Sequence, residues 1–189
     1  FHATKVFNTF EGGAIICPDL ETKVRIDQLK NFGHEGETRV VAVGLNGKMS
    51  EFNAALGLLQ LEHIDQAISK RKQIDILYRT KLAAIKGIQC IEDSGEVEKN
   101  YAYFPIRVLN DYPIGRDELV DRMKANGVHP RRYFYPLISE YPMYRDFPSS
   151  NPDLLPEATL ASAQVLCLPI YPDLETTIVE EICQFIAEQ

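Results

Sequence analysis

Apolar side chains recur every three or four residues in several stretches of the chain, which is the spacing of a helix with one buried face. A short helix is predicted over 21–32, and Ser50 can cap the start of another. A second helix is predicted after 63–65 and is expected to end at Gly87. Further helices are predicted over 119–127, 156–165 and 175–187.

Strands are predicted where apolar residues alternate with polar ones or form a short run. The run 13–18 ends in Pro-Asp, which predicts a buried strand followed by a turn. In 101–108 apolar residues alternate with tyrosine and arginine, as in a strand with one buried face. Pro105 lacks a backbone donor, so an edge position is predicted for this strand. Another short strand is predicted at 166–169.

Two stretches have too little periodicity for either element. The glycine-rich stretch 33–48 is predicted to be a loop that can hold a strand at 39–43, and the aromatic, proline-rich stretch 133–148 is predicted to be irregular. Long loops inside compact proteins are often functional. The pattern places a domain boundary within or just before the helix that follows 63–65, and predicts a small α/β unit after it.

Composition limits the class of protein. The 189 residues are enough for one ordinary domain, or for one domain plus a piece of another. The apolar and charged fractions, 45% and 25%, are those of a soluble globular protein. A net charge of −7 argues against a nucleic-acid-binding surface, so a phosphate-bearing ligand must be held by local groups.

The cysteines and the apolar runs fit a cytoplasmic enzyme, and they would also fit many other soluble proteins. No Cys-x-x-Cys pair occurs, so buried reduced thiols are predicted rather than disulfides or a metal site. No apolar stretch is long enough to span a membrane, and no signal peptide is recognisable. The four cysteines are Cys17, Cys90, Cys167 and Cys183.

Lys5 belongs to the stretch with the most candidate chemistry. It ends the run Phe-His-Ala-Thr-Lys, and after four more residues Phe-Glu-Gly-Gly-Ala-Ile begins. A lone lysine near the start of a chain is usually only a solvated charge. Here the neighbouring phenylalanines can give an amine apolar cover, short polar side chains can hydrogen-bond, and Gly12-Gly13 permits close backbone approach.

Two later segments carry further polar groups. In 44–55, Asn46 lies in a glycine-flanked turn, and by itself it is best interpreted as a turn residue. In 127–137, two adjacent arginines precede Tyr133; arginines can pair with phosphate, and tyrosines can stack on a base or bond a sugar hydroxyl. A packed aromatic loop with two surface arginines is an equal alternative.

An acidic cluster lies in the loop around 92–98, without histidines or rigid spacing. A solvated loop is predicted there, not a metal site. The cluster consists of Glu92, Asp93, Glu96 and Glu98.

These segments resemble the DegT/DnrJ/StrS family of sugar-nucleotide aminotransferases, which depend on pyridoxal 5'-phosphate (PLP). The likeness runs along essentially the whole chain and is carried by the Lys5 segment, by Gly-Leu-Asn-Gly-Lys-Met with the Ala-Ala…Gln-Leu helix after it, and by 127–137. It implies an α/β fold of the aspartate aminotransferase type (fold type I). Residues 1–62 would end the large PLP-binding domain, and 63–189 would form the small C-terminal α/β domain. Family members carry most of the large domain before this lysine, so we expect the chain to be the C-terminal part of an enzyme and incomplete by itself.

The resemblance also implies roles for residues. Lys5 would form a Schiff base with PLP, be displaced by the amino donor and then move protons as a general base. Asn46 would reach across a homodimer interface to the PLP phosphate of the other subunit. Lys48 stands where the family usually has arginine; it keeps the charge but loses bidentate geometry, so no contact is assigned to it. Tyr133 is the candidate substrate contact. His34 lies in a loop that borders the active site in relatives, and a solvated histidine is its alternative.

The implied reaction moves an amino group, usually from glutamate, to a nucleotide-linked keto sugar. Segments 1–5 and 46–51 are most similar to family members that form dTDP-4-amino-4,6-dideoxyglucose, so the expected substrate is a dTDP-4-keto-6-deoxyhexose. Two alternatives stay open. One is a PLP- or PMP-dependent sugar dehydratase, in which a histidine replaces the lysine; Lys5 speaks against it. The other is an inactive fragment or interaction module that lacks the upstream cofactor pocket.

Overall fold

The computed structural model describes residues 1–92, 95 and 97–189. The described residues divide into two compact units, Phe1–Asp65 and Gln66–Gln189. Helix α2 (Glu51–Leu82, 32 residues) runs from the first unit into the second. The sequence predicted two helices here, which is wrong, because His63, Ile64 and Asp65 are all compatible with a helix and nothing breaks it.

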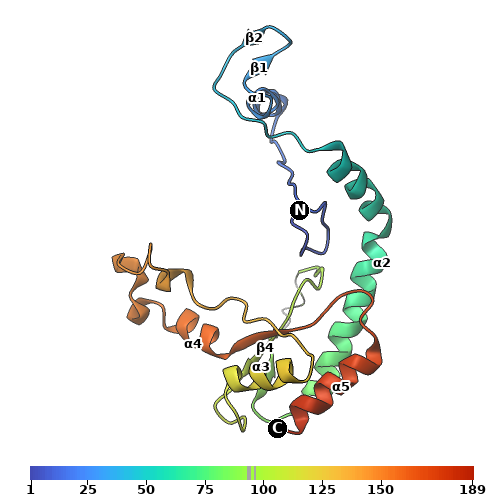
Figure 1. Ribbon diagram of the computed structural model, residues 1–189, viewed down its shortest axis with the longest axis vertical. Helices are drawn as coiled ribbons and strands as arrows, with labels where there is room; N and C mark the ends of the chain where they lie inside the picture. The colour runs from blue at the N-terminus through green and yellow to red at the C-terminus, as the bar shows by residue number, and fades with distance from the viewer. Residues whose placement is uncertain (93–94, 96) are drawn as a thin grey trace. The chain divides into compact units, whose positions relative to one another are not determined.

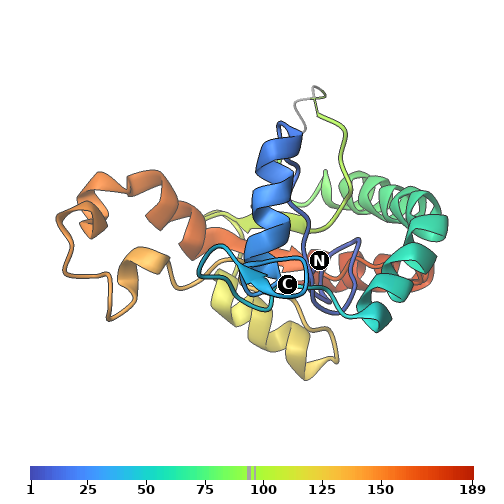
Figure 2. The same cartoon turned by 90° about the horizontal axis from the view of Figure 1, so that it is seen from above.

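In the first unit, a helix is followed by a small hairpin. The Asp19 side chain caps α1 (Leu20–Lys30) by accepting a hydrogen bond from the Thr22 N–H. Strands β1 (His34–Glu35) and β2 (Arg39–Val40) pair antiparallel, and they are neighbours of α1 in both views (Figures 1 and 2). The predicted helix and the strand expected at the start of 39–43 are therefore present.

The strand predicted at 13–18 does not form. This segment has no secondary structure, and Ile15 and Ile16 are 70% and 97% exposed. A strand needs a neighbour that takes up its backbone hydrogen bonds, and no described segment of this unit pairs with 13–18. The expectation is therefore wrong for the described chain, because an apolar run by itself supplies no pairing partner.

The second unit is built on a three-stranded antiparallel sheet in the order β3-β4-β5. Its strands are β3 (Ile88–Cys90), β4 (Phe104–Val108) and β5 (Val165–Leu168). On β4, buried and half-buried side chains alternate, as the sequence predicted for a strand with one buried face.

Pro105 lies in the central strand, so the predicted edge position is wrong. Its neighbour across the pair is Cys167, and Cys167 exchanges both of its backbone hydrogen bonds with Arg131 on the other side of β5. The Pro105 nitrogen therefore faces β3, whose last paired residue, Cys90, lies opposite Ile106. Because β3 ends at Cys90, one residue before the position that would lie opposite Pro105, the missing N–H of proline costs no hydrogen bond of the sheet.

Three helices pack with this sheet around one hydrophobic core. The second half of α2, α3 (Arg116–Ala125) and α5 (Thr176–Ala187) contribute to it (Figure 1). The Tyr78 ring of α2 stacks on Phe104 of β4 at 4.8 Å between ring centroids. Leu119, Val120 and Met123 form the buried side of α3, as predicted. The chain between the core elements contains η1 (Ile138–Glu140), η2 (Pro148–Ser150), η3 (Pro152–Leu154) and α4 (Pro156–Gln164).

The cysteines are all free thiols in the described part of the chain. The predicted burial is correct for Cys167 and Cys183, whereas Cys17 and Cys90 are only half-buried. Among the described residues, no helix is both long and apolar enough to cross a membrane.

Candidate functional site

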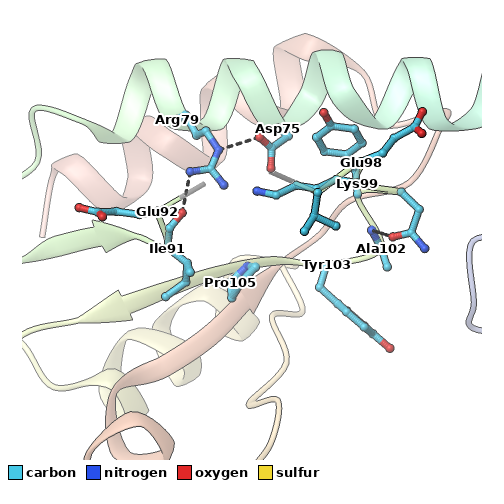
Figure 3. Close-up of a pocket in the computed structure, with 12 residues that line it drawn as sticks. Asp75, Arg79, Ile91, Glu92, Glu98, Lys99, Ala102, Tyr103 and Pro105 are labelled. Carbon is cyan, nitrogen blue, oxygen red and sulfur yellow. Dashed lines mark hydrogen bonds and ion pairs between the residues drawn. The ribbon is translucent and has the colours of Figure 1, made fainter. Parts of the chain in front are cut away.

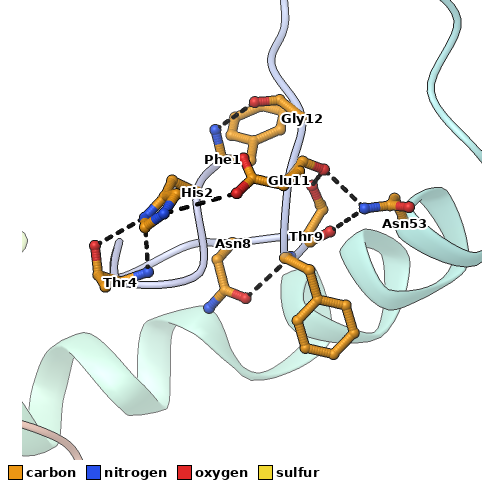
Figure 4. Close-up of polar contacts among 9 residues, drawn as sticks. Phe1, His2, Thr4, Asn8, Thr9, Glu11, Gly12 and Asn53 are labelled. Atoms are coloured by element: carbon orange, nitrogen blue, oxygen red, sulfur yellow. Dashed lines mark hydrogen bonds and ion pairs between the residues drawn. The ribbon is translucent and has the colours of Figure 1, made fainter.

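The turn that follows Lys5 is fastened to the start of α2. The Asn53 amide donates to the carbonyl oxygens of Thr9 and Glu11 at 2.5 and 2.9 Å (Figure 4). Thr9 is 2% exposed, and its hydroxyl also donates to the Glu11 carbonyl, at 2.6 Å. The backbone just beyond Lys5 therefore has a defined path.

Lys5 itself presents its side chain to solvent. Its N–H donates to the His2 carbonyl at 2.9 Å, but its amine has no hydrogen bond or ion pair within the described part of the chain. The expected apolar cover is partial, since Phe1 and Phe10 are 38% and 66% exposed. The described residues of this unit fix the backbone of the lysine and do not supply the surroundings that would desolvate its amine.

Gly12 makes the close approach for which the sequence predicted a glycine. A Cβ atom at this position would lie 2.6 Å from Met49 Cε and 2.7 Å from Thr9 Oγ1. Gly13, in contrast, has open space around it. Only the first glycine of the pair is required by packing.

Asn46 and the Gly12-Gly13 pair line the same hollow, which has a volume of about 370 Å³. Asn46 is exposed, and its side chain has no hydrogen-bond partner in the part of the chain that the structure describes. Lys5 is not among the residues that line the hollow, and neither is His34. The lining consists of Glu11, Gly12, Gly13, Asn46, Gly47, Lys48, Met49, Ser50 and Asn53.

Lys48, for which the sequence assigned no contact, binds the end of α1. Its Nζ donates to Asn31 Oδ1 at 2.9 Å and lies 4.4 Å from the centroid of the Phe32 ring. His34 is half-buried in β1, where its N–H donates to the Asn31 carbonyl at 3.0 Å. The described contacts of His34 are those of a structural hairpin residue.

Tyr133 lies in the second unit, within a small aromatic cluster. Its ring meets Tyr103 edge-on at 5.3 Å and stacks on Phe134 at 4.7 Å. The Arg131 guanidinium lies 5.8 Å from the Tyr133 ring centroid. Tyr103 was not singled out from the sequence, although the alternation in 101–108 already placed it on the face of the predicted strand away from the core; it directly precedes β4.

The two adjacent arginines have different environments. Arg132 Nε donates to Asp117 of α3 at 2.6 Å, so this guanidinium is already engaged. Arg131 is exposed. Burial by itself would raise the pKa of Asp117, but the hydrogen bond from Arg132 and the charge of Arg116 outweigh it and lower that pKa. Of the two arginines that the sequence offered for phosphate, only Arg131 is available.

A second hollow, of about 490 Å³, lies between α2 and the chain that leads into β4 (Figure 3). Asp75 is buried there and accepts a hydrogen bond from Arg79 Nε at 2.7 Å, while Arg79 Nη1 donates to the Ile91 carbonyl at 2.8 Å. This buried carboxylate is thus paired, as a structural ion pair requires. Glu92 and Glu98 of the acidic cluster line the hollow.

The other members of that acidic cluster, Asp93 and Glu96, lie outside the described residues. Among those that are described, no group of three or more histidine, cysteine, aspartate or glutamate side chains could hold a metal ion.

The class of protein follows from the match with known families. The model of the DegT/DnrJ/EryC1/StrS aminotransferase family matches residues 1–187, and the chain belongs to this family. The predicted family is therefore confirmed.

Two curated relatives are similar to this chain over nearly its whole length. The dTDP-4-amino-4,6-dideoxy-D-glucose transaminase of Escherichia coli is 51% identical over 177 residues, which cover 94% of this chain and 48% of that protein. The transaminase of the same name from Shigella dysenteriae is 48% identical over 188 residues, covering 100% of this chain and 51% of that protein. The chain thus spans about half the length of these curated relatives.

Solved structures agree in fold. The structure of DesI in the presence of its TDP-sugar product matches with a TM-score of 0.84 and 31% identity, covering 100% of this chain and 47% of DesI. Helicobacter pylori PseC, an aminotransferase involved in the biosynthesis of pseudoaminic acid, matches with a TM-score of 0.87, covering 100% of this chain and 51% of PseC. At 21% identity the PseC likeness shows the fold alone. These matches confirm the predicted α/β fold class of the sugar aminotransferases.

Proposed function

We propose that this chain belongs to a PLP-dependent aminotransferase that moves an amino group from glutamate to a nucleotide-linked keto sugar. The observation that carries the proposal is the family match over residues 1–187 together with Lys5, whose turn is anchored to α2 by Asn53. The proposed domain boundary lies at 62/63, between the end of the large domain and the small domain. The division of the described residues at Asp65 supports it.

The residues present fit PLP at two points. Lys5 offers an amine with no partner in the described part of the chain, and Asn46 offers an unpaired amide in a hollow beside Gly12. An exposed amide suits a phosphate oxygen, since it donates without carrying a charge that must be neutralised. When bound, PLP supplies the electron sink that makes the α-hydrogen of an amino acid acidic.

Each residue has a distinct part in this proposal. Lys5 would hold PLP through Nζ, and its free amine would accept and return a proton. Asn46 donates from Nδ2 to the phosphate of the PLP in the other subunit of a homodimer. Tyr133, held by Tyr103 and Phe134, contacts the nucleotide sugar. His34 stays a second candidate for that substrate.

The proposed substrate is a dTDP-4-keto-6-deoxyhexose. Its support is the 51% and 48% identity to two proteins named dTDP-4-amino-4,6-dideoxy-D-glucose transaminase. The reaction that gives those relatives their name would place this protein in deoxysugar and polysaccharide biosynthesis.

The experiment uses the purified full-length protein with PLP, glutamate and dTDP-4-keto-6-deoxyglucose. Mass spectrometry is expected to detect the 4-amino sugar and 2-oxoglutarate in equal amounts. Lys5→Ala is expected to lower the rate by at least about 10³-fold, because both the covalent anchor and the proton carrier are lost. Amination of a different keto sugar, with the dTDP sugar left unchanged, would reject the proposed substrate.

The two alternatives give different results in the same experiment. A sugar dehydratase would release a product that has lost a hydroxyl group and gained no nitrogen. An inactive protein would show no visible absorbance of lysine-bound PLP and no borohydride-fixed label on Lys5. Either result would overturn the aminotransferase assignment.

A further inference from the structure

The loop that carries Asn46 is hydrogen-bonded to the last turn of α1. The Leu45 N–H donates to the Leu29 carbonyl at 2.9 Å, and the Gly47 N–H donates to the Lys30 carbonyl at 2.8 Å. The last carbonyls of a helix have no partner within the helix, so the loop supplies donors that α1 requires. The Asn46 backbone is therefore held on both sides by one helix end.

Two glycines make this close approach feasible. A Cβ atom on Gly44 would lie 2.3 Å from the Gly33 nitrogen and 2.5 Å from the Leu29 carbonyl oxygen. Gly33 has φ +81°, and a Cβ there would lie 1.8 Å from the Ala42 carbonyl oxygen. At Gly44 the loop thus lies backbone to backbone against the end of α1.

Lys48 adds a side-chain contact to the same helix end. Asn31, the C-cap residue of α1, accepts from Lys48 Nζ at 2.9 Å, and the neighbouring Phe32 ring lies 4.4 Å from that Nζ. A cation is favourable beside the carbonyl end of a helix and over an aromatic face. Lys48 follows Asn46 by two residues, so its contact closes the loop just beyond the asparagine.

We propose that Lys48 is a positioning residue: by clamping Asn31 and Phe32 it holds the 44–48 loop on α1 and fixes the direction of the Asn46 amide toward the PLP phosphate. This inference rests on the proposed role of Asn46. It also explains how a lysine can replace the arginine that is usual in the family, because a single cation satisfies both Asn31 and the Phe32 ring. Lys48→Arg is therefore expected to retain the function, and Lys48→Met to lose it.

The clamp is tested by amide hydrogen exchange in the purified protein. In Lys48→Met, the Leu45 and Gly47 amides are expected to exchange about tenfold faster, because the loop opens more often from α1. Lys48→Arg is expected to stay within about twofold of the parent protein. The matched control is Lys23→Met, which removes a lysine of α1 whose ion-pair partner is Asp27 and is expected to leave both amides unchanged.

The effect on Asn46 is tested by comparing the affinities for PLP and for pyridoxal, which lacks the phosphate. Asn46→Ala and Lys48→Met are each expected to weaken PLP binding at least about fivefold and to leave pyridoxal binding unchanged. The double variant is expected to bind PLP no more weakly than Asn46→Ala, because both changes remove the same contact.

The outcomes separate the two proposals. If Asn46→Ala weakens PLP and pyridoxal equally, the proposed role of Asn46 in the function fails. If Asn46→Ala is selective for PLP but Lys48→Met is not, Lys48 does not position Asn46. Unchanged exchange of Leu45 and Gly47 in Lys48→Met overturns the clamp whatever the cofactor measurements show.

Discussion

At the scale of single residues, Asn53 connects two distant parts of the first unit. Its amide nitrogen donates to two carbonyl oxygens of the turn after Lys5, 42 and 44 residues earlier in the chain. Asn53 also lies at the first turn of α2, where Ser50 Oγ accepts from its N–H at 3.2 Å. The position of the Lys5 turn thus depends on a residue whose own backbone is set by a helix cap.

Replacing Asn53 tests this connection. Asn53→Ala removes both hydrogen bonds of the amide and is expected to destabilise the first unit by about 1–3 kcal/mol, because the Thr9 and Glu11 carbonyls each lose one of their two donors; the Glu11 N–H and the Thr9 hydroxyl remain. The measurement is the free energy of unfolding from urea titration. Asn8→Ala is the matched control; the hydrogen bonds of Asn8 are long, 3.4 and 3.5 Å, so a change within about 0.5 kcal/mol is expected. Equal effects of the two changes would contradict this account.

At the scale of elements, Arg116 joins α3 to the end of α4. The residue is 5% exposed, and Nη1 donates to the Ser162 and Val165 carbonyls, both at 2.9 Å. Its Nε lies 2.8 Å from Asp117 Oδ1 as an ion pair without hydrogen-bond geometry. The guanidinium also lies 4.9 Å from the Tyr135 ring, so it supports the segment that carries Tyr133.

Arg116→Met is expected to destabilise the second unit by about 2–4 kcal/mol, because two carbonyls lose a charged donor in a buried site. Arg122→Met is the control on the same helix. Arg122 pairs with Glu118 in an exposed position, and such pairs contribute about 0–1 kcal/mol. Thermal or urea unfolding of both variants checks the difference, and a cost for Arg116→Met as small as that of the control would refute the buried role.

The Asp117–Arg132 contact makes the stability of this region depend on pH. Since the folded state lowers the pKa of Asp117 below its ordinary value of 3.8, its stabilising contribution is present above that pH and is lost as the pH falls below it. The difference in unfolding free energy between the parent protein and Asp117→Asn is expected to shrink as the pH is lowered from 6 to about 2.5. A difference that stays constant over this range would show that the carboxylate charge does not matter.

At the scale of the whole molecule, the thiols report on the fold of the second unit. Burial raises the pKa of Cys167 and of Cys183 to about 11 in each case. Because the thiolate is the reactive form, alkylation of these two cysteines at pH 8 is expected to be at least about 100-fold slower than in the unfolded chain. Peptide mass spectrometry after timed labelling measures the rates, with labelling in guanidinium as the control. Rapid labelling of both cysteines in the native protein would contradict the described core.

Much of the fold could be predicted because short-range pattern and packing agree. Leu119, Val120 and Met123 have helical spacing, and they are buried against the core. The helix predicted at 21–32 likewise has a cap residue, Asp19, next to it in the sequence. Errors arose where the outcome depends on a distant partner: the run 13–18 lacks a neighbouring strand among the described residues, and the end of β3 decides whether Pro105 is tolerated in the centre of the sheet.

The sequence by itself determined the family, because that depends on the order and identity of residues such as Lys5, Asn46 and Tyr133 along the chain. Only the tertiary structure decided which side chains are engaged and which are available. Arg131 and Arg132 are neighbours in sequence, yet only Arg132 lies beside Asp117. Lys48 faces α1 because two glycines bring its loop against the helix end, a contact between segments 17 residues apart. Such choices rest on distances between remote parts of the chain, which no local pattern encodes.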